Sequence, residues 1–186
     1  GTLIKAVISS PLPDPAFMQP FKLPSFKGLR SFSNWITVLF FKILPLELIV
    51  PVISRTGLIG IALQFAYKCS IKKDFELLRI VSVPAQRSTA PRALRAMCLG
   101  MSIRRNSQTA PFLLKELSGK ADRCPFLLIW GKEDKLVPFK VANLIVKDNP
   151  WIELKVVEDS GHCVHDESAH QFNQTVLNWL YKSNLS

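Results

Sequence analysis

Five consecutive apolar residues, Phe126–Trp130 (FLLIW), constrain most strongly how this chain can fold. A strand that is apolar at every position must be covered on both faces, as strands inside a parallel sheet are. The residues that follow predict a helix opened by Pro138, a strand over Ile152–Val157 and an amphipathic helix over Ala169–Tyr181. This strand–helix–strand–helix order predicts an α/β fold with a mostly parallel sheet.

The first residues of the chain predict a further strand of the same sheet. Leu3–Ser10 is short and rich in Ile and Val, and the prolines of Pro11–Pro15 prevent its continuation because each lacks a backbone donor. The sequence therefore divides into a core strand at 1–12, a helical insertion at 13–123 and the C-terminal part of the core at 124–186.

The insertion shows helical patterns broken by prolines. Its most apolar stretch, Trp35–Ile53, is interrupted by two charged residues and two prolines, whereas a membrane-spanning helix needs about 20 largely apolar residues in a row. We therefore expect short helices and no transmembrane span. The expected helices are Ile36–Leu44 and Glu47–Ile53, separated at Pro45 and Pro51, then Gly57–Tyr67, one from Ser88–Pro91 to about Met101, and one from Thr109–Pro111 through Leu117.

The net charge of +10 is unevenly distributed. Before Cys124 the chain contains 18 Lys and Arg residues and six Asp and Glu residues. From Cys124 onward it contains six Lys and Arg residues and eight Asp and Glu residues. The basic residues form no dense cluster interleaved with aromatic residues, so we do not expect nucleic acid as a partner. A basic, apolar insertion suits peripheral contact with an anionic membrane surface, or an amphiphilic substrate.

Neither the cysteines nor the stretch from His162 to His170 predicts a metal or another cofactor. The four cysteines lack CxxC spacing, and we expect reduced core residues, with Cys98 and Cys124 in apolar runs. The stretch from His162 to His170 is rich in potential ligands, but one crowded segment with a single Cys is unlike the paired ligands of zinc sites. We therefore expect neither a metal nor a cofactor.

An acid and a histidine follow neighbouring predicted strands. Asp134 comes after Phe126–Trp130, and His162 comes after Ile152–Val157, 28 positions later. Because parallel strands end at one edge of a sheet, we expect the two side chains to meet there and to form two thirds of a Ser-His-Asp type triad. Each also has a structural interpretation: Asp134 as a turn or helix-capping residue, and His162 as a core or capping residue.

The neighbouring polar residues receive lesser roles. Glu133 is the alternative acid, Asp159 is expected in a solvated turn, and Glu167 is expected to cap the final helix. Ser9 and Ser10 end a strand without flanking glycines and make poor nucleophiles.

Two motifs resemble those of the α/β-hydrolase superfamily. WGKEDKLVP is similar to its G-x-x-D-x-x-x-P turn, and SGHCVHDE is similar to its G-H-x-x-x-x-E segment. The resemblance implies that Asp134 is the triad acid and His162 the general base. It also implies a partial α/β-hydrolase fold, comprising its last three strands with a helical cap.

A narrower resemblance concerns GHCVHDE, the opening SPLPDP, LPLE with the later ISRT, and PAQRSTAPRALRAMC. These segments are similar to chloroplast and cyanobacterial hydrolases of the pheophytinase and chlorophyll dephytylase type. The resemblance implies hydrolysis of a lipophilic ester, the phytyl ester of chlorophyll-type pigments, at thylakoid membranes of the chloroplast. The sequence itself shows no targeting segment.

One family motif is absent. The nucleophile of these hydrolases lies in G-x-S-x-G, and no two of the eight glycines here are four positions apart. We expect that these 186 residues alone do not hydrolyse esters. The alternative is a non-catalytic truncated or splice product that acts as a binding module. An upstream Asp nucleophile, as in haloalkane or epoxide hydrolases, also stays open.

Overall fold

The computed structural model describes residues 6–9, 39–40, 42–55, 58–120 and 124–182. Contacts along the chain divide it into two compact units. The sheet unit comprises Gly1–Met18, Leu63–Ser70 and Thr109–Ser186, and the helical unit comprises Gln19–Ala62 and Ile71–Gln108.

The sheet has three parallel strands in the order β1-β2-β3. They are β1 (Ala6–Ser9), β2 (Phe126–Gly131) and β3 (Ile152–Val157), and Phe126 is in register with Ala6 on one side and Ile152 on the other. The predicted α/β class is confirmed. The end residues of the predicted strand Leu3–Ser10 lie outside the described residues.

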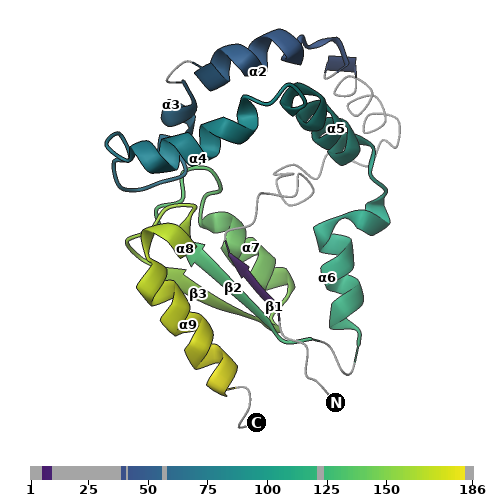
Figure 1. Ribbon diagram of the computed structural model, residues 1–186. Coiled ribbons are helices and arrows are strands. Elements are labelled where there is room, and N and C mark those ends of the chain that lie inside the picture. Colours follow the sequence, from purple (N-terminus) through teal and green to yellow (C-terminus); the bar gives the residue numbers. More distant parts are fainter. Residues whose placement is uncertain (1–5, 10–38, 41, 56–57, 121–123, 183–186) are drawn as a thin grey trace. The chain divides into compact units, whose positions relative to one another are not determined.

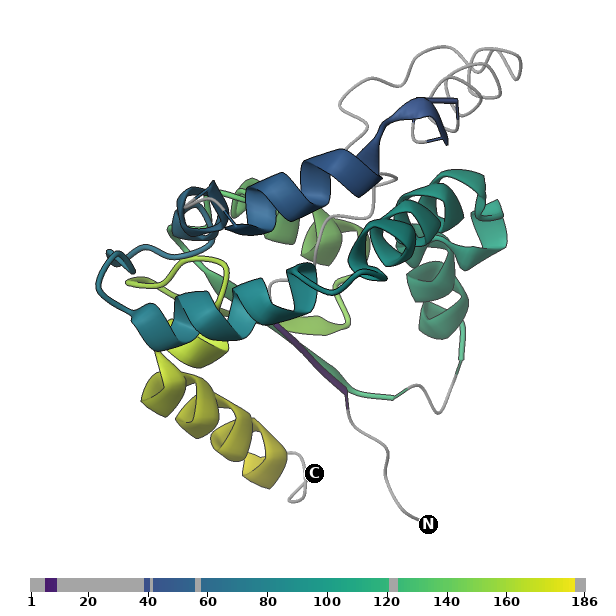
Figure 2. The same cartoon turned by 45° about the horizontal axis from the view of Figure 1, so that its top comes forward.

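Helices cover both faces of this sheet, which explains why β2 is apolar throughout. Leu128 and Trp130 face a cluster completed by α7 (Lys140–Asp148) and by Leu114 of α6 (Ala110–Ser118). The alternate residues of β2, Leu127 and Ile129, are fully buried against the other two helices. Those helices are α8 (Val164–Glu167) and α9 (Ala169–Lys182). Figure 1 and Figure 2 show α7 and α9 on opposite sides of the strands.

The helical unit contains short helices packed on one another, with α2 contacting both α4 and α5. Its elements are α2 (Leu46–Arg55), the greater part of α3 (Leu58–Gln64), α4 (Phe75–Ala85), α5 (Ala90–Ile103) and the 3-10 turn η1 (Asn106–Gln108). Among the described residues no single helix is long and apolar enough to cross a membrane, and α2 and α3 reach that length and composition only together, as a bent pair.

One prediction about the helices of this unit is wrong, and one helix was missed. The predicted break at Pro51 is wrong, because α2 continues through it. An interior proline removes a backbone donor and crowds the carbonyl four residues earlier, which can bend a helix without ending it. The helix α4 was not predicted, because charged residues obscured its period; Asp74 caps it by accepting from the N–H of Leu77 at 2.9 Å. Part of the predicted helix Ile36–Leu44 lies outside the described residues.

The insertion predicted at 13–123 stays a prediction. Two stretches within it, Leu63–Ser70 and the helix α6, have their contacts in the sheet unit. Cys69 is exposed and the other three cysteines are half-buried, so their assignment to the core is wrong.

Two backbone segments approach each other closely at the carboxyl end of the sheet. A Cβ atom added to Gly131 would lie 2.0 Å from the carbonyl oxygen of Gly161 and 2.5 Å from that of Ser160. We therefore expect Gly131→Ala to lower the free energy of unfolding of the sheet unit by about 3 kcal/mol, because the backbone must move apart. Urea unfolding followed by tryptophan fluorescence measures this loss, since Trp130, Trp151 and Trp179 all lie in this unit.

Gly100 in α5 provides the control, because a Cβ there meets no atom within 4 Å. Gly100→Ala is expected to be neutral or to stabilise the helix by up to about 1 kcal/mol, measured by far-UV circular dichroism. Equal stability of Gly131→Ala and the unsubstituted chain would contradict this description of the sheet edge.

Candidate active site

Asp134 lies in the turn that follows β2, with a fully buried carboxylate. Its Oδ1 accepts hydrogen bonds from the backbone N–H groups of Leu136 at 2.9 Å and Val137 at 2.8 Å. The turn is fixed further by the indole of Trp130, whose Nε1–H donates to the carbonyl of Val137 at 3.1 Å. Asp134 therefore organises its own turn, as the structural interpretation of this residue predicts.

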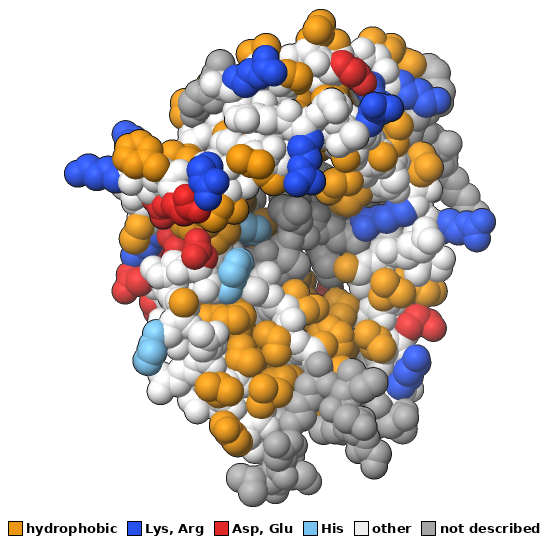
Figure 3. All heavy atoms as spheres, in the orientation of Figure 1, with side chains coloured by type: hydrophobic (Ala, Val, Ile, Leu, Met, Phe, Trp, Pro, Cys, Tyr) orange, Lys and Arg blue, Asp and Glu red, His pale blue; other side chains and the backbone are white. Residues whose placement is uncertain are grey.

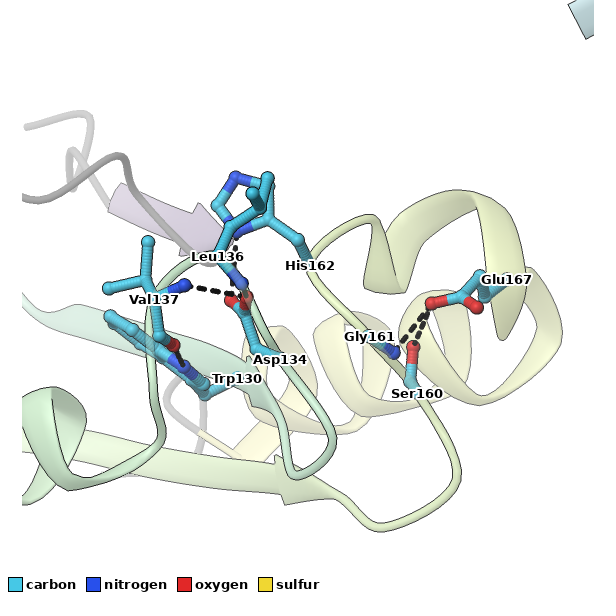
Figure 4. Close-up of polar contacts among 8 residues, drawn as sticks. All are labelled: Trp130, Asp134, Leu136, Val137, Ser160, Gly161, His162 and Glu167. Carbon is cyan, nitrogen blue, oxygen red and sulfur yellow. Dashed lines mark hydrogen bonds and ion pairs between the residues drawn. The ribbon is translucent and has the colours of Figure 1, made fainter. Parts of the chain in front are cut away.

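The second carboxylate oxygen of Asp134 is bonded to His162. The distance from His162 Nδ1 to Asp134 Oδ2 is 2.8 Å, and the imidazole is 14% exposed (Figure 4). An ionised carboxylate can only accept, so in a pair of carboxylate and neutral imidazole Nδ1 donates and Nε2, which is directed away from Asp134, is the acceptor of the ring. The structure thus brings together the two residues that the sequence paired.

The loops that carry these two residues are joined through their backbones. The N–H of Lys132 donates to the carbonyl of Val157 at 2.9 Å, and that of Glu133 donates to Ser160 at 3.0 Å. Glu133, the alternative acid, has an exposed side chain, so it is Asp134 that faces the histidine.

Glu167 has a different position from the one predicted. Its carboxylate accepts from the N–H of Gly161 at 2.5 Å, and the Ser160 hydroxyl is 3.5 Å away. Its other oxygen accepts from the N–H groups of Lys68 at 2.5 Å and Cys69 at 3.2 Å. The expectation that Glu167 caps the final helix is therefore wrong, because the short helix α8 turns the side chain back toward the histidine loop.

The segment 66–69 makes three further bonds to the histidine loop and α8. The backbone N–H of His162 donates to the carbonyl of Ala66 at 2.7 Å. The Tyr67 hydroxyl donates to Asp166 at 2.7 Å, and Lys68 Nζ forms an ion pair with Asp159 at 2.5 Å. These contacts join residues more than 90 positions apart, and no local pattern in the sequence predicts them.

The polar contacts of this segment shift several pKa values. Burial is the main cause that raises the pKa of the Tyr67 hydroxyl, and its bond to Asp166 acts in the same direction. Burial also raises the pKa of the Cys163 thiol. The hydrogen bond from Lys68 lowers the pKa of Asp159, so the exposed turn predicted at Asp159 is correct in exposure but contains an ion pair.

The remaining candidate residues have no place in this arrangement. Ser9 ends β1 with its hydroxyl buried and without a hydrogen-bond partner, and Ser10 lies outside the described residues. Within the part of the chain that the structure describes, no three His, Cys, Asp or Glu side chains are grouped so as to hold a metal ion.

Comparisons with known proteins match parts of the chain. No family model matches the chain. A 2-hydroxy-6-oxononadienedioate/2-hydroxy-6-oxononatrienedioate hydrolase of a Pseudomonas species is 39% identical over 56 residues, which are 30% of this chain and 20% of that protein. The hydrolase of the same name from Klebsiella pneumoniae is 36% identical over 59 residues, 32% of this chain and 20% of the relative.

Among solved structures, a thermophilic esterase from Thermogutta terrifontis superimposes with a TM-score of 0.52 at 21% identity. The match covers 74% of this chain and 48% of the esterase, so the chain spans about half of that structure.

The chain has part of an α/β-hydrolase fold. The similarity to curated hydrolases, over about a third of this chain and a fifth of those proteins, supports its placement in the α/β-hydrolase superfamily. The narrower likeness to chlorophyll dephytylases is not shown by these comparisons.

The buried carboxylate can be tested by its effect on stability. In Asp134→Ala the N–H groups of Leu136 and Val137 lose their acceptor, and each unsatisfied buried donor costs about 1–3 kcal/mol. We expect a loss of about 3 kcal/mol in urea unfolding, and a smaller loss for Asp134→Asn, which keeps one acceptor oxygen.

Asp148→Ala, at the exposed end of α7, is the matched control, with an expected change within about 0.5 kcal/mol. A similar loss for Asp134→Ala and Asp148→Ala would show that the carboxylate does not organise the turn.

Proposed function

We propose that this chain carries the acid and the general base of a serine ester hydrolase. The observation that supports this proposal is the 2.8 Å bond between His162 Nδ1 and the fully buried Asp134 carboxylate. Both residues follow parallel strands of one sheet, at the edge where ligands of open α/β sheets bind.

In the proposed reaction, His162 Nε2 removes the proton from a serine hydroxyl while the serine oxygen attacks the ester carbonyl. Asp134 holds the imidazole in the required tautomer and stabilises the imidazolium that forms. The imidazolium then protonates the leaving alcohol as the C–O bond breaks, and water attacks the acyl-enzyme by the same route in reverse. The serine comes from outside these 186 residues, because they contain no G-x-S-x-G.

The proposed substrate class is a lipophilic ester, with the phytyl ester of chlorophyll-type pigments as the specific candidate. The resemblance of GHCVHDE and of the other quoted segments to chlorophyll dephytylases supports this candidate. The same resemblance is the basis for proposing the chloroplast thylakoid as the location. Large exposed apolar side chains on the helical unit, such as Leu48 at 71% and Phe75 at 77% exposure, are compatible with an isoprenoid chain.

The first test uses the 186-residue chain by itself. We expect no release of p-nitrophenol from p-nitrophenyl esters above the buffer rate and no labelling by a fluorophosphonate probe, since the nucleophile is missing. Turnover or labelling of this chain would contradict the proposed division of the triad.

The second test uses a polypeptide that contains these residues together with a G-x-S-x-G segment. Asp134→Asn and His162→Ala are each expected to lower kcat for ester hydrolysis by about 10⁴-fold, as removal of a triad member does. Glu133→Gln is the control and should leave kcat within a factor of about two, because an exposed side chain that does not face His162 adds less than about 0.5 kcal/mol. Unchanged kcat in Asp134→Asn and His162→Ala would favour the alternative, a non-catalytic binding module.

We also propose that the helical unit contacts an anionic membrane surface. Its described residues carry ten Lys and Arg against three Asp and Glu, and Figure 3 shows basic side chains interspersed with hydrophobic ones over its helices. Each basic residue near such a surface contributes about 1 kcal/mol. The apolar side chains of α2 and α4 add hydrophobic contact.

Vesicle co-sedimentation tests this proposal. The chain should bind phosphatidylglycerol vesicles more tightly than phosphatidylcholine vesicles, and about 1 M NaCl should weaken the binding because the screening length falls to about 3 Å. Replacing Lys72 and Lys73 by Gln should weaken binding about 30-fold, at about 1 kcal/mol per residue. The same change at Lys140 and Lys147 of α7 should have little effect, and equal losses in the two pairs would contradict the assignment to the helical unit.

A further inference from the structure

We infer that Glu167 is a positioning residue for His162 and that it acts by fastening the segment 66–69 to the histidine loop. The inference deepens the proposed function, on which it rests. It concerns a carboxylate that contacts neither Asp134 nor the imidazole in any bond of the structure.

The two oxygens of Glu167 serve two different segments. Oε2 accepts from Gly161, the residue immediately before the histidine, and Oε1 accepts from Lys68 and Cys69. Bonds from N–H groups to a charged acceptor are about twice as strong as neutral ones. A single side chain therefore links backbone segments that lie more than 90 positions apart in the sequence.

The segment so held contacts the histidine directly. The carbonyl of Ala66 accepts from the backbone N–H of His162 at 2.7 Å. The backbone of the histidine is thus fixed on one side by Ala66 and on the other by the bond between Gly161 and Glu167. With this backbone fixed, the imidazole lies at hydrogen-bonding distance from Asp134.

The atoms around Gly161 leave no room for a side chain at this position. A Cβ atom there would lie 2.7 Å from the Ala66 carbonyl oxygen, 2.8 Å from Glu167 Oε2 and 2.9 Å from the Lys68 nitrogen. All three groups take part in the contacts that join the segment 66–69 to the histidine loop. Gly161 therefore lies where these contacts meet.

The segment 66–69 has a second property that follows from the order of the chain. Leu63–Ser70 is the covalent link between the two stretches of the helical unit, Gln19–Ala62 and Ile71–Gln108. The link is fastened to the histidine loop by Glu167, and in addition by the Tyr67–Asp166 and Lys68–Asp159 contacts. Its role at His162 explains why this link belongs to the sheet unit.

The test is nuclear magnetic resonance on the full 186-residue chain labelled with ¹⁵N. The Nδ1 proton of His162, bonded to Asp134, should give a downfield resonance coupled to the ring nitrogen. In Glu167→Gln this resonance should broaden or disappear, because glutamine has one acceptor oxygen and cannot serve both segments. Hydrogen exchange at the His162 amide should become at least 10-fold faster, since hydrogen bonds to a charged group are lost.

Two variants serve as controls. Tyr67→Phe removes the bond to Asp166 but none of the bonds of Glu167, and should keep the downfield resonance. Glu116→Gln, on the exposed side of α6, should leave both the resonance and the exchange unchanged. An unchanged resonance and unchanged His162 exchange in Glu167→Gln would overturn the inference.

A measurement on the unsubstituted chain keeps the inference testable if Glu167→Gln does not fold. The amides of Lys68, Gly161 and His162 should exchange through one shared opening and show similar protection. Free exchange at Lys68 beside strong protection at Gly161 and His162 would overturn the inference. None of these readouts depends on catalysis. Ester hydrolysis that survives His162→Ala would therefore refute the proposed function and leave the inference about Glu167 untouched.

Discussion

A buried carboxylate is costly unless donors surround it, and the fully buried Asp134 is the residue on which the described site depends. Its donors are the N–H groups of Leu136 and Val137 and the ring of His162. The first two close the turn after β2, and the third brings the loop after β3 against that turn. One charged group therefore determines both the shape of the sheet edge and the orientation of the imidazole.

A second carboxylate, that of Glu167, holds the same loop from the other direction. It accepts hydrogen bonds from the backbone N–H groups of Gly161 and Lys68, which lie far apart in the sequence. The close approach of Gly131 to Gly161 completes the arrangement, because two segments without Cβ atoms can touch. The histidine loop thus contacts a strand end, the short helix α8 and the segment 66–69, all within the sheet unit.

Much of the sheet unit could be predicted from the sequence because its signals are local. The strand Ile152–Val157 was predicted with its observed bounds, and β2 extends only to Gly131 beyond its predicted end. The pairing of Asp134 with His162 followed from the rule that parallel strands end at one edge. The contacts of Tyr67 and Lys68 could not be predicted, because they depend on residues more than 90 positions away. Glu167 belonged to a recognised motif, yet its partners depend on the direction in which α8 turns its side chain.

A structure of the natural polypeptide that carries these 186 residues, after reaction with a fluorophosphonate, would test the proposed acid–histidine pair most directly. The predicted result is a phosphonylated serine outside these residues, with its Oγ within about 3.2 Å of His162 Nε2 and with Asp134 still bonded to Nδ1. A labelled side chain remote from His162, or a polypeptide in which no serine is labelled, would contradict the proposal.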